Sequence, residues 1–301
     1  MTPVLVVITG ATASGKSSLA VALARRLGCD IISADSRQVY REIPIGTAAP
    51  SAADLAAVRH HFIGTLSLTD YYSAARFEAD VMALLPGLFA ENPVQVMCGG
   101  SMMYVDAVTD GIDPLPDISP EVRQRVADLD RDHGLPGMLA LLDNLDPEYG
   151  AVVDRANTRR VAHALEIILA SGVTYTSLRR RAGAERPFRI VKVALDLPRP
   201  LLYERINARV DRMVADGLVD EARRVYPLRH LNALNTVGYK EMFAYFDGQM
   251  SLPEAVARIA KNTRTYARKQ LTWLARPTVR PAVMLPPDDA LDAILSLIDR
   301  K

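Results

Sequence analysis

The feature that most restricts how this chain can fold is the run GATASGKS at residues 10–17. It fits the pattern G-x-x-x-x-G-K-[ST], which binds phosphate when it connects a strand to a helix. Residues 3–9 are a short β-branched apolar run, and an apolar-periodic segment follows from 17 to 27 and ends near Gly28. The sequence therefore predicts a strand, a phosphate-binding loop (P-loop) and a helix in succession.

Each part of this loop has a chemical reason. Glycines let the backbone curl so that successive N–H groups point at phosphate oxygens, and the helix N-terminus adds the positive end of its dipole. Lys16 supplies a charge for the outer phosphate, and Ser17 can hold Mg²⁺ through its hydroxyl. The pattern predicts phosphate binding and does not by itself predict ATP hydrolysis. The predicted phosphate-binding residues are Gly10, Ala11, Thr12, Ala13, Ser14, Gly15, Lys16 and Ser17, with Ser17 as the predicted metal ligand.

Further short apolar segments alternate with helical segments along the chain. Short buried strands that alternate with helices are typical of a parallel sheet with helices on its faces. The predicted fold class is therefore α/β, with a P-loop NTPase-like parallel sheet flanked by helices. Strands are predicted at 31–34, 94–98 and 189–197, and helices at 73–90, 200–225, 253–275 and 288–299.

The middle of the chain departs from this pattern. From 114 to 187 we find no convincing strand, and we predict helical stretches at 119–132, 136–143 and 157–171. We therefore predict a helical insertion domain at 114–187. It would interrupt a single core that residues 1–113 and 188–301 form.

Composition limits location and partners. The net charge is +1, so a nucleic-acid partner must be argued from local patches. The two cysteines, Cys29 and Cys98, are too few for a zinc site and are expected to be reduced core thiols. The N-terminal run TPVLVVITG has no basic leader and is too short to span a bilayer. These features predict a cytoplasmic protein that does not enter a membrane, and we expect a monomer.

Two further loops are expected beside the P-loop. The run DSRQVY at 35–40 follows the predicted strand at 31–34, and GGSMMY at 99–104 follows the one at 94–98. The carboxyl ends of parallel strands meet at one edge of a sheet, and ligands bind there. We therefore expect the three loops to line one crevice.

These loops and several later segments resemble the bacterial and organellar tRNA dimethylallyltransferases. The matching segments run in the family's order from the first strand to about Trp273. They are GATASGKS, DSRQVY, GTAAP at 46–50, YSAARF at 72–77, GGSMMY, NTRRVAHALEI at 157–167, GYKE at 238–241 and NTRTYARKQLTW at 262–273. The departures are Ala11 for Pro, Ser17 and Ser101 for Thr, Met102–Met103 for Gly-Leu, and His163 for Arg.

The resemblance implies a reaction. A dimethylallyl group would pass from dimethylallyl diphosphate to the exocyclic amine of the adenosine at position 37 in a tRNA anticodon loop, with release of diphosphate. The implied partners are the tRNA anticodon stem-loop and dimethylallyl diphosphate, and the implied cofactor is Mg²⁺. The base must leave its stack to reach the crevice, and loops favour this because their bases can splay out.

Three residues receive catalytic roles from the resemblance. Asp35 would be the general base for the amine; alternatively it caps a turn or orders a metal-bound water. Arg209 would hold diphosphate oxygens, or else it lies on a solvated helix face. Ser101 would help to fix the amine, or the hydroxyl serves only the local structure.

The predicted RNA contacts combine motif residues with a basic helix face. Arg258, Lys261, Arg264 and Arg268 recur at three- and four-residue spacing in the helix at 253–275, so they share one face, which we call the basic stripe. Lys269, Arg276 and the run Arg179–Arg181 add charge, although a basic helix face can also be simply solvated. The predicted tRNA-binding residues are Asp35, Ser36, Arg37, Gln38, Ser101, Arg123, Arg159, Arg160, Val161, Ala162, His163, Gly238, Tyr239, Lys240, Arg264 and Arg268. We expect the insertion at 114–187 to contact tRNA.

Other interpretations remain open at this stage. Phe77, Met102, Met103 and Tyr104 either line an apolar tunnel for the allyl group or belong to the core. A nucleotide or metabolite kinase would share the sheet and the P-loop, although DSRQVY and YARKQLTW argue against it. A non-catalytic RNA-binding protein that senses nucleotide through the P-loop is a further alternative.

Overall fold

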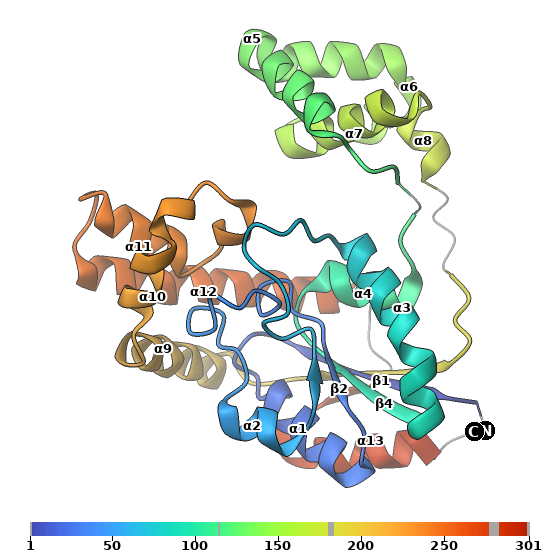
Figure 1. Cartoon of the computed structure of the whole chain (residues 1–301), viewed down its shortest axis with the longest axis vertical. Coiled ribbons are helices and arrows are strands. Elements are labelled where there is room, and N and C mark those ends of the chain that lie inside the picture. The colour runs from blue at the N-terminus through green and yellow to red at the C-terminus, as the bar shows by residue number, and fades with distance from the viewer. Residues whose placement is uncertain (1, 114, 180–183, 277–282, 300–301) are drawn as a thin grey trace. The chain divides into compact units, whose positions relative to one another are not determined.

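The computed structural model describes residues 2–113, 115–179, 184–276 and 283–299. The chain forms two compact units: residues 1–110 with 185–301 make up the larger, and residues 111–184 the smaller. The predicted insertion, 114–187, covers nearly the same stretch. Figure 1 shows the elements of both units.

The larger unit is built on one parallel sheet with the strand order β3-β2-β4-β1-β5-β6. Strand β1 lies between β4 and β5, and Val4 is paired with Val94 and Arg189. The predicted α/β class with a parallel sheet is confirmed. The strands are β1 (Val4–Gly10), β2 (Ile31–Ser33), β3 (His60–His61), β4 (Val94–Cys98), β5 (Arg189–Leu195) and β6 (Val283–Leu285).

Helices cover both faces of the sheet because successive side chains of a strand point to opposite sides. Val4, Val6 and Ile8 pack into one cluster with α1 (Lys16–Leu27) and α13 (Ala290–Asp299). Leu5 and Val7 pack into another with α3 (Ala74–Glu91) and α4 (Met102–Asp110). Figure 1 shows these two pairs of helices on opposite sides of the sheet.

A third helical layer packs beside the P-loop end of the sheet. Its helices are α9 (Arg199–Ala215), α10 (Leu218–Val225), α11 (Tyr239–Phe246) and α12 (Leu252–Leu274). The predicted helix at 200–225 is broken at Gly217, whose φ of 103° ends the first helix and starts the second. The elements that were not predicted from the sequence include the strands β3 and β6 and the helices α4 and α11. They also include α2 (Ala52–Ala57) and the 3₁₀ turns Tyr226–Leu228, Asn232–Leu234 and Pro287–Asp289.

The regular elements among the described residues of the smaller unit are all helices, and the unit has its own core. Its helices are α5 (Pro120–Leu145), α6 (Pro147–Val152), α7 (Thr158–Ser171) and α8 (Tyr175–Leu178). Gly134, with φ 62°, kinks α5 between the two helices predicted there. Met138, Leu142 and Val161 are fully buried in this core. Arg179 lies over the rings of Tyr149 and Tyr175, whereas Arg180 and Arg181 lie outside the described residues.

Candidate active site

The P-loop runs between the last residue of β1, Gly10, and the first of α1, Lys16. Gly10 and Gly15 have φ values of 151° and 100°, which side chains on L-residues rarely allow. A Cβ on Gly10 would lie 2.8 Å from the Ser14 hydroxyl oxygen. The glycines therefore permit the tight curl that turns backbone N–H groups inward.

The lysine of the loop is held close to its backbone. Its Nζ donates a hydrogen bond to the Ala11 carbonyl at 3.2 Å. Burial lowers the pKa of Lys16 below its ordinary value, while the nearby Cys98 and Asp35 act in the opposite direction. The ammonium group thus lies in the loop, where a phosphate would be bound.

Arg209 faces the P-loop from α9. Its Nη1 donates to the Thr12 hydroxyl at 3.1 Å, and its Nη2 donates to the Thr47 carbonyl at 3.4 Å. Burial lowers its pKa, with Asp35 as the opposing charge. The solvated-face alternative for Arg209 is therefore wrong.

Two further arginines on α9 were missed by the sequence analysis. Arg205 and Arg212 border, with Arg209, a hollow of about 360 Å³ against Gly15 and Lys16. Their positions four residues before and three residues after Arg209 place all three on one helix face, and this spacing is the signal that could have found them.

Asp35 follows β2 and uses its two carboxylate oxygens differently. Oδ1 accepts the backbone N–H groups of Arg37 at 2.9 Å and of Gln38 at 3.3 Å, which closes a turn. Among the described residues none donates a hydrogen bond to Oδ2. Asp35 thus does cap a turn, as one alternative had it, and one oxygen is still available for a proton.

Ser101 ties the loop after β4 to the loop after β2. Its hydroxyl accepts the Ser36 N–H at 2.8 Å and donates to the Ser36 hydroxyl at 3.2 Å. These contacts favour the structural alternative for Ser101, because they position the segment that carries Asp35.

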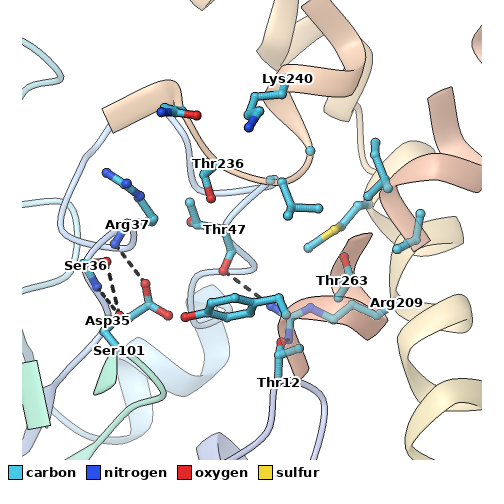
Figure 2. Close-up of a pocket in the computed structure, with 18 residues that line it drawn as sticks. Thr12, Asp35, Ser36, Arg37, Thr47, Ser101, Arg209, Thr236, Lys240 and Thr263 are labelled. Carbon is cyan, nitrogen blue, oxygen red and sulfur yellow. Dashed lines mark hydrogen bonds between the residues drawn. The ribbon is translucent and has the colours of Figure 1, made fainter. Parts of the chain in front are cut away.

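These groups surround one cavity of about 400 Å³ (Figure 2). Asp35 and Arg209 point into it from opposite sides in this view. One part of its wall is polar, and another consists of Val210, Met213, Val237 and Ile259. The cavity is lined by Thr12, Asp35, Ser36, Arg37, Gly46, Thr47, Ser101, Arg209, Val210, Met213, Asn235, Thr236, Val237, Gly238, Lys240, Ile259, Thr263 and Tyr266.

The apolar wall corrects the tunnel interpretation made from the sequence. Phe77 and Tyr104 are buried in the core and stack at 4.4 Å between ring centroids, and Met103 is 68% exposed. Packing between α3 and α4, rather than contact with a ligand, accounts for the two aromatic residues. The core alternative is confirmed for them.

The sequence analysis missed most residues that α9 and α12 bring to the cavity. Val210 and Met213 follow Arg209 at one and four residues, and Ile259, Thr263 and Tyr266 recur at helical spacing on α12. Extending the helix face of Arg209 by one turn could have found Met213.

Two predicted RNA-binding residues are corrected by their burial. Tyr239 is fully buried, and its hydroxyl donates to the buried carboxylate of Glu221 at 2.5 Å. Val161 is fully buried in the core of the smaller unit. Neither side chain can face RNA, because both are covered by neighbouring side chains. In the same GYKE segment, Gly238 and Lys240 do line the cavity.

Gln38 is held by the protein itself. Its Nε2 donates to the carbonyls of Thr47 and Ala48 at 3.2 and 3.0 Å. These two hydrogen bonds hold the segment whose Thr47 carbonyl also accepts a hydrogen bond from Arg209. Arg37 and Ser36 line the cavity. The RNA contacts predicted for these three residues stay predictions.

The other predicted RNA contacts lie on exposed or half-buried surface. In the smaller unit, Arg123, Arg159, Arg160 and His163 are exposed and Ala162 is half-buried. On α12, the members of the basic stripe are exposed except Arg264, which donates to the Asn207 side chain at 2.6 Å. Exposure fits both RNA binding and simple solvation of these residues.

Three further predictions concern metal ligands, membrane-spanning helices and the two cysteines, and each can be compared with the described residues. Within them there is no group of three or more His, Cys, Asp or Glu side chains that could hold a metal ion. Ser17 is exposed in the first turn of α1, at the rim of the hollow with the three arginines. Across the described part of the chain, no helix is long and apolar enough to cross a membrane. Cys29 and Cys98 are free and buried, as predicted.

Together, the parallel sheet, the P-loop after β1 and the acid after β2 define an α/β protein of the P-loop NTPase-like class with a cavity at the carboxyl edge, where ligands of such sheets bind. The chain belongs to the family described as IPP transferase, which it matches over residues 38–277.

Relatives and solved structures agree with this membership. The chain is 52% identical over 276 residues, 92% of each chain, to the tRNA dimethylallyltransferase 1 of Phocaeicola vulgatus. It is 54% identical over 272 residues, 90% of this chain and 91% of the relative, to the tRNA dimethylallyltransferase 2 of Porphyromonas gingivalis. The crystal structure of the tRNA isopentenylpyrophosphate transferase of Bacillus halodurans matches with a TM-score of 0.70 and 34% identity over 98% of this chain and 95% of that chain.

Proposed function

We propose that this protein transfers a dimethylallyl group from dimethylallyl diphosphate to the exocyclic amine of the adenosine at position 37 in a tRNA anticodon loop, releasing diphosphate. The observation that carries the proposal is the single cavity in which the free oxygen of Asp35 and the guanidinium of Arg209 face each other beside the P-loop. The relatives named above as tRNA dimethylallyltransferases support it.

The P-loop side of the cavity suits the leaving group. As the carbon–oxygen bond breaks, negative charge grows on the diphosphate, and preorganised donors lower the energy of that charge. The backbone N–H groups of the loop, Lys16 and Arg209 supply such donors. Arg205 and Arg212 add positive charge in the adjoining hollow.

The apolar wall suits the allyl group. Val210, Met213 and Ile259 line the same cavity as Arg209, so a hydrocarbon chain attached to a diphosphate at Arg209 would reach this apolar wall. Water excluded from this wall cannot compete with the amine for the allylic carbon.

Asp35 suits the proton transfer. The amine nitrogen forms a bond to the allylic carbon, the carbon–oxygen bond to diphosphate breaks, and Oδ2 of Asp35 takes the proton that nitrogen loses. Since Oδ1 is held by two backbone N–H groups, the carboxylate is already oriented when the amine arrives.

The RNA side of the proposal rests on exposed charge. We assign tRNA contact to Arg37, Lys240 and the basic stripe in the larger unit, and to Arg123, Arg159, Arg160 and His163 in the smaller. Backbone phosphates attract such cations irrespective of sequence.

A serine hydroxyl beside a phosphate-binding loop fits Mg²⁺, because this ion usually keeps several waters and binds through a few protein oxygens together with substrate phosphates. Ser17 would hold the ion through its hydroxyl, as the only protein ligand that we assign. When bound, Mg²⁺ would neutralise charge on the diphosphate. The cytoplasmic location and the monomeric state remain predictions.

The test combines purified protein, dimethylallyl diphosphate and an anticodon stem-loop RNA that carries adenosine at position 37. We expect the RNA to gain one C₅H₈ unit by mass spectrometry and free diphosphate to appear in equal amount. The matched control is the same stem-loop with guanosine at that position. Release of ADP from ATP with a phosphorylated acceptor would support the kinase alternative, and RNA binding without a covalent product would support the RNA-binding alternative.

A further inference from the structure

Gln270 lies in the NTRTYARKQLTW segment on α12, and none of the roles assigned above involves it. Its side chain is buried, with 3% exposure. Its Oε1 accepts the backbone N–H of Thr12 at 2.8 Å, and its Nε2 donates to the backbone carbonyl of Gly100 at 2.9 Å. One side chain therefore joins the P-loop to the loop after β4.

The amide is suited to this task because it offers one acceptor and one donor side by side. Both partners are backbone groups of fixed polarity, so only one orientation of the amide satisfies them. Gly100 leaves room for the contact: a Cβ at this position would lie 2.4 Å from the Gln270 nitrogen. The amide thus fits between the Thr12 N–H on one side and the Gly100 carbonyl on the other, and a glycine at position 100 leaves the space that it occupies.

Each contact leads to a different part of the cavity. On the P-loop side, the hydroxyl of Thr12 accepts the hydrogen bond from Arg209. On the other side, Gly100 precedes Ser101, whose hydroxyl accepts the N–H of Ser36 next to Asp35. Gln270 is the shared support of the diphosphate part and the acceptor part.

We propose that Gln270 is a positioning residue that fixes the diphosphate-binding part of the cavity relative to the part that carries Asp35. The proposal rests on the proposed function and adds a residue to it. Gln270 touches backbone groups of the protein and acts through Thr12 and Gly100.

This arrangement has a kinetic consequence. Each substrate contacts its own part of the cavity, so binding of either one alone does not depend on the spacing between the two parts. Transfer does depend on it, because a misplacement of about 1 Å between reacting groups can cost about 10²-fold in rate. Loss of the Gln270 bridge is therefore expected to lower the rate in the ternary complex and to leave the separate affinities nearly unchanged.

Gln270→Glu tests this within one folded variant. The ionised carboxylate keeps the acceptor for Thr12 but loses the donor for Gly100, whereas the protonated carboxyl offers both. Burial raises the pKa of such a carboxyl, whereas the positive charge of Lys16, whose Cε also lies near Gly100, lowers it, so the protonated fraction grows as the pH is lowered. The single-turnover rate relative to wild type is expected to be about 10–100-fold low at pH 8 and to recover as the pH is lowered.

Two variants complete the design. Gln270→Met keeps the length and removes both polar groups, so its rate is expected to stay low at every pH. Thr272→Ala is the control, because the Thr272 hydroxyl is exposed and, among the described residues, bonds within its own helix to the Arg268 carbonyl. Binding of inorganic diphosphate and of the stem-loop RNA is measured separately for each variant, together with thermal unfolding.

The outcomes separate the two proposals. Recovery of the Gln270→Glu rate at low pH, with both affinities within about threefold of wild type, supports the positioning role. A rate ratio that does not change with pH, or a loss of diphosphate or RNA affinity large enough to explain the slower transfer, overturns it. If wild-type protein itself forms no prenylated RNA, it is the proposed function that fails.

Discussion

Replacing Asp35 by Asn tests the general-base assignment with little disturbance of the loop. The turn depends on Oδ1, which accepts from the N–H groups of Arg37 and Gln38, and an amide oxygen can take its place. The amide nitrogen then stands where Oδ2 was, and it cannot accept a proton at neutral pH. The variant therefore removes the base and retains the turn.

The magnitudes separate the two roles of this carboxylate. Exchanging a charged for a neutral acceptor in the turn costs about 1 kcal/mol of stability. Loss of a general base costs about 10²–10⁴ in rate, which corresponds to roughly 3–5 kcal/mol of barrier. Turnover is thus expected to fall by that factor in a protein that is still folded.

The assay measures the single-turnover rate of transfer from a preformed complex of enzyme, tRNA and dimethylallyl diphosphate. Asp35→Ala is the companion variant, because it loses the turn as well as the base and is expected to lose a further 1 kcal/mol or so of stability. A wild-type rate for Asp35→Asn in this assay would refute the assignment, and the amine would then have to lose its proton to another acceptor. A slow rate that high tRNA or high Mg²⁺ restores would indicate a binding role.

Three further perturbations address other parts of the molecule. Lys16→Ala is expected to lower turnover by about 10²–10³, because it removes a charge next to the leaving diphosphate; near wild-type turnover would place the diphosphate elsewhere. Arg264→Glu with Arg268→Glu is expected to weaken RNA binding and to flatten its log–log salt dependence by about 0.7–0.9 per lost phosphate contact, and an unchanged slope would assign these residues to solvent. Tyr239→Phe removes a hydrogen bond to the buried Glu221 carboxylate and is expected to lower the free energy of unfolding, measured in urea, by about 1–3 kcal/mol. An unchanged free energy of unfolding would be expected if the Tyr239 hydroxyl served only to contact RNA.

The local parts of the site could be predicted from the sequence. The P-loop is a contiguous segment whose pattern of residues identifies it, and its glycines adopt φ values that other residues avoid. The run at residues 3–9 is mostly apolar without alternation, which predicts a buried strand, and helices do cover both sides of β1. The loops of Asp35 and Ser101 were expected at the site because each follows a recognisable strand, and parallel strands bring their carboxyl ends to one edge. The roles of the two residues came from the family resemblance.

The helical half of the site was decided by tertiary structure. From the sequence, Phe77, Met102, Met103 and Tyr104 were either an apolar tunnel or core, whereas the apolar wall of the cavity includes Val210 and Met213. Apolar residues at helical spacing look alike in a sequence whether they face the core or a cavity, because only the packing partner distinguishes the two. For the same reason Tyr239, chosen as an RNA contact, proved to be buried against Glu221.

Gln270 shows most clearly which contacts cannot be predicted from the sequence. Thr12 and Gln270 are 258 residues apart, and nothing near either residue in the sequence indicates that the glutamine amide will meet the P-loop. A strand or a loop is specified by its own residues and their immediate neighbours. A hydrogen bond between distant segments requires that α12 pack across the end of the sheet, which depends on buried surface contributed by the whole chain.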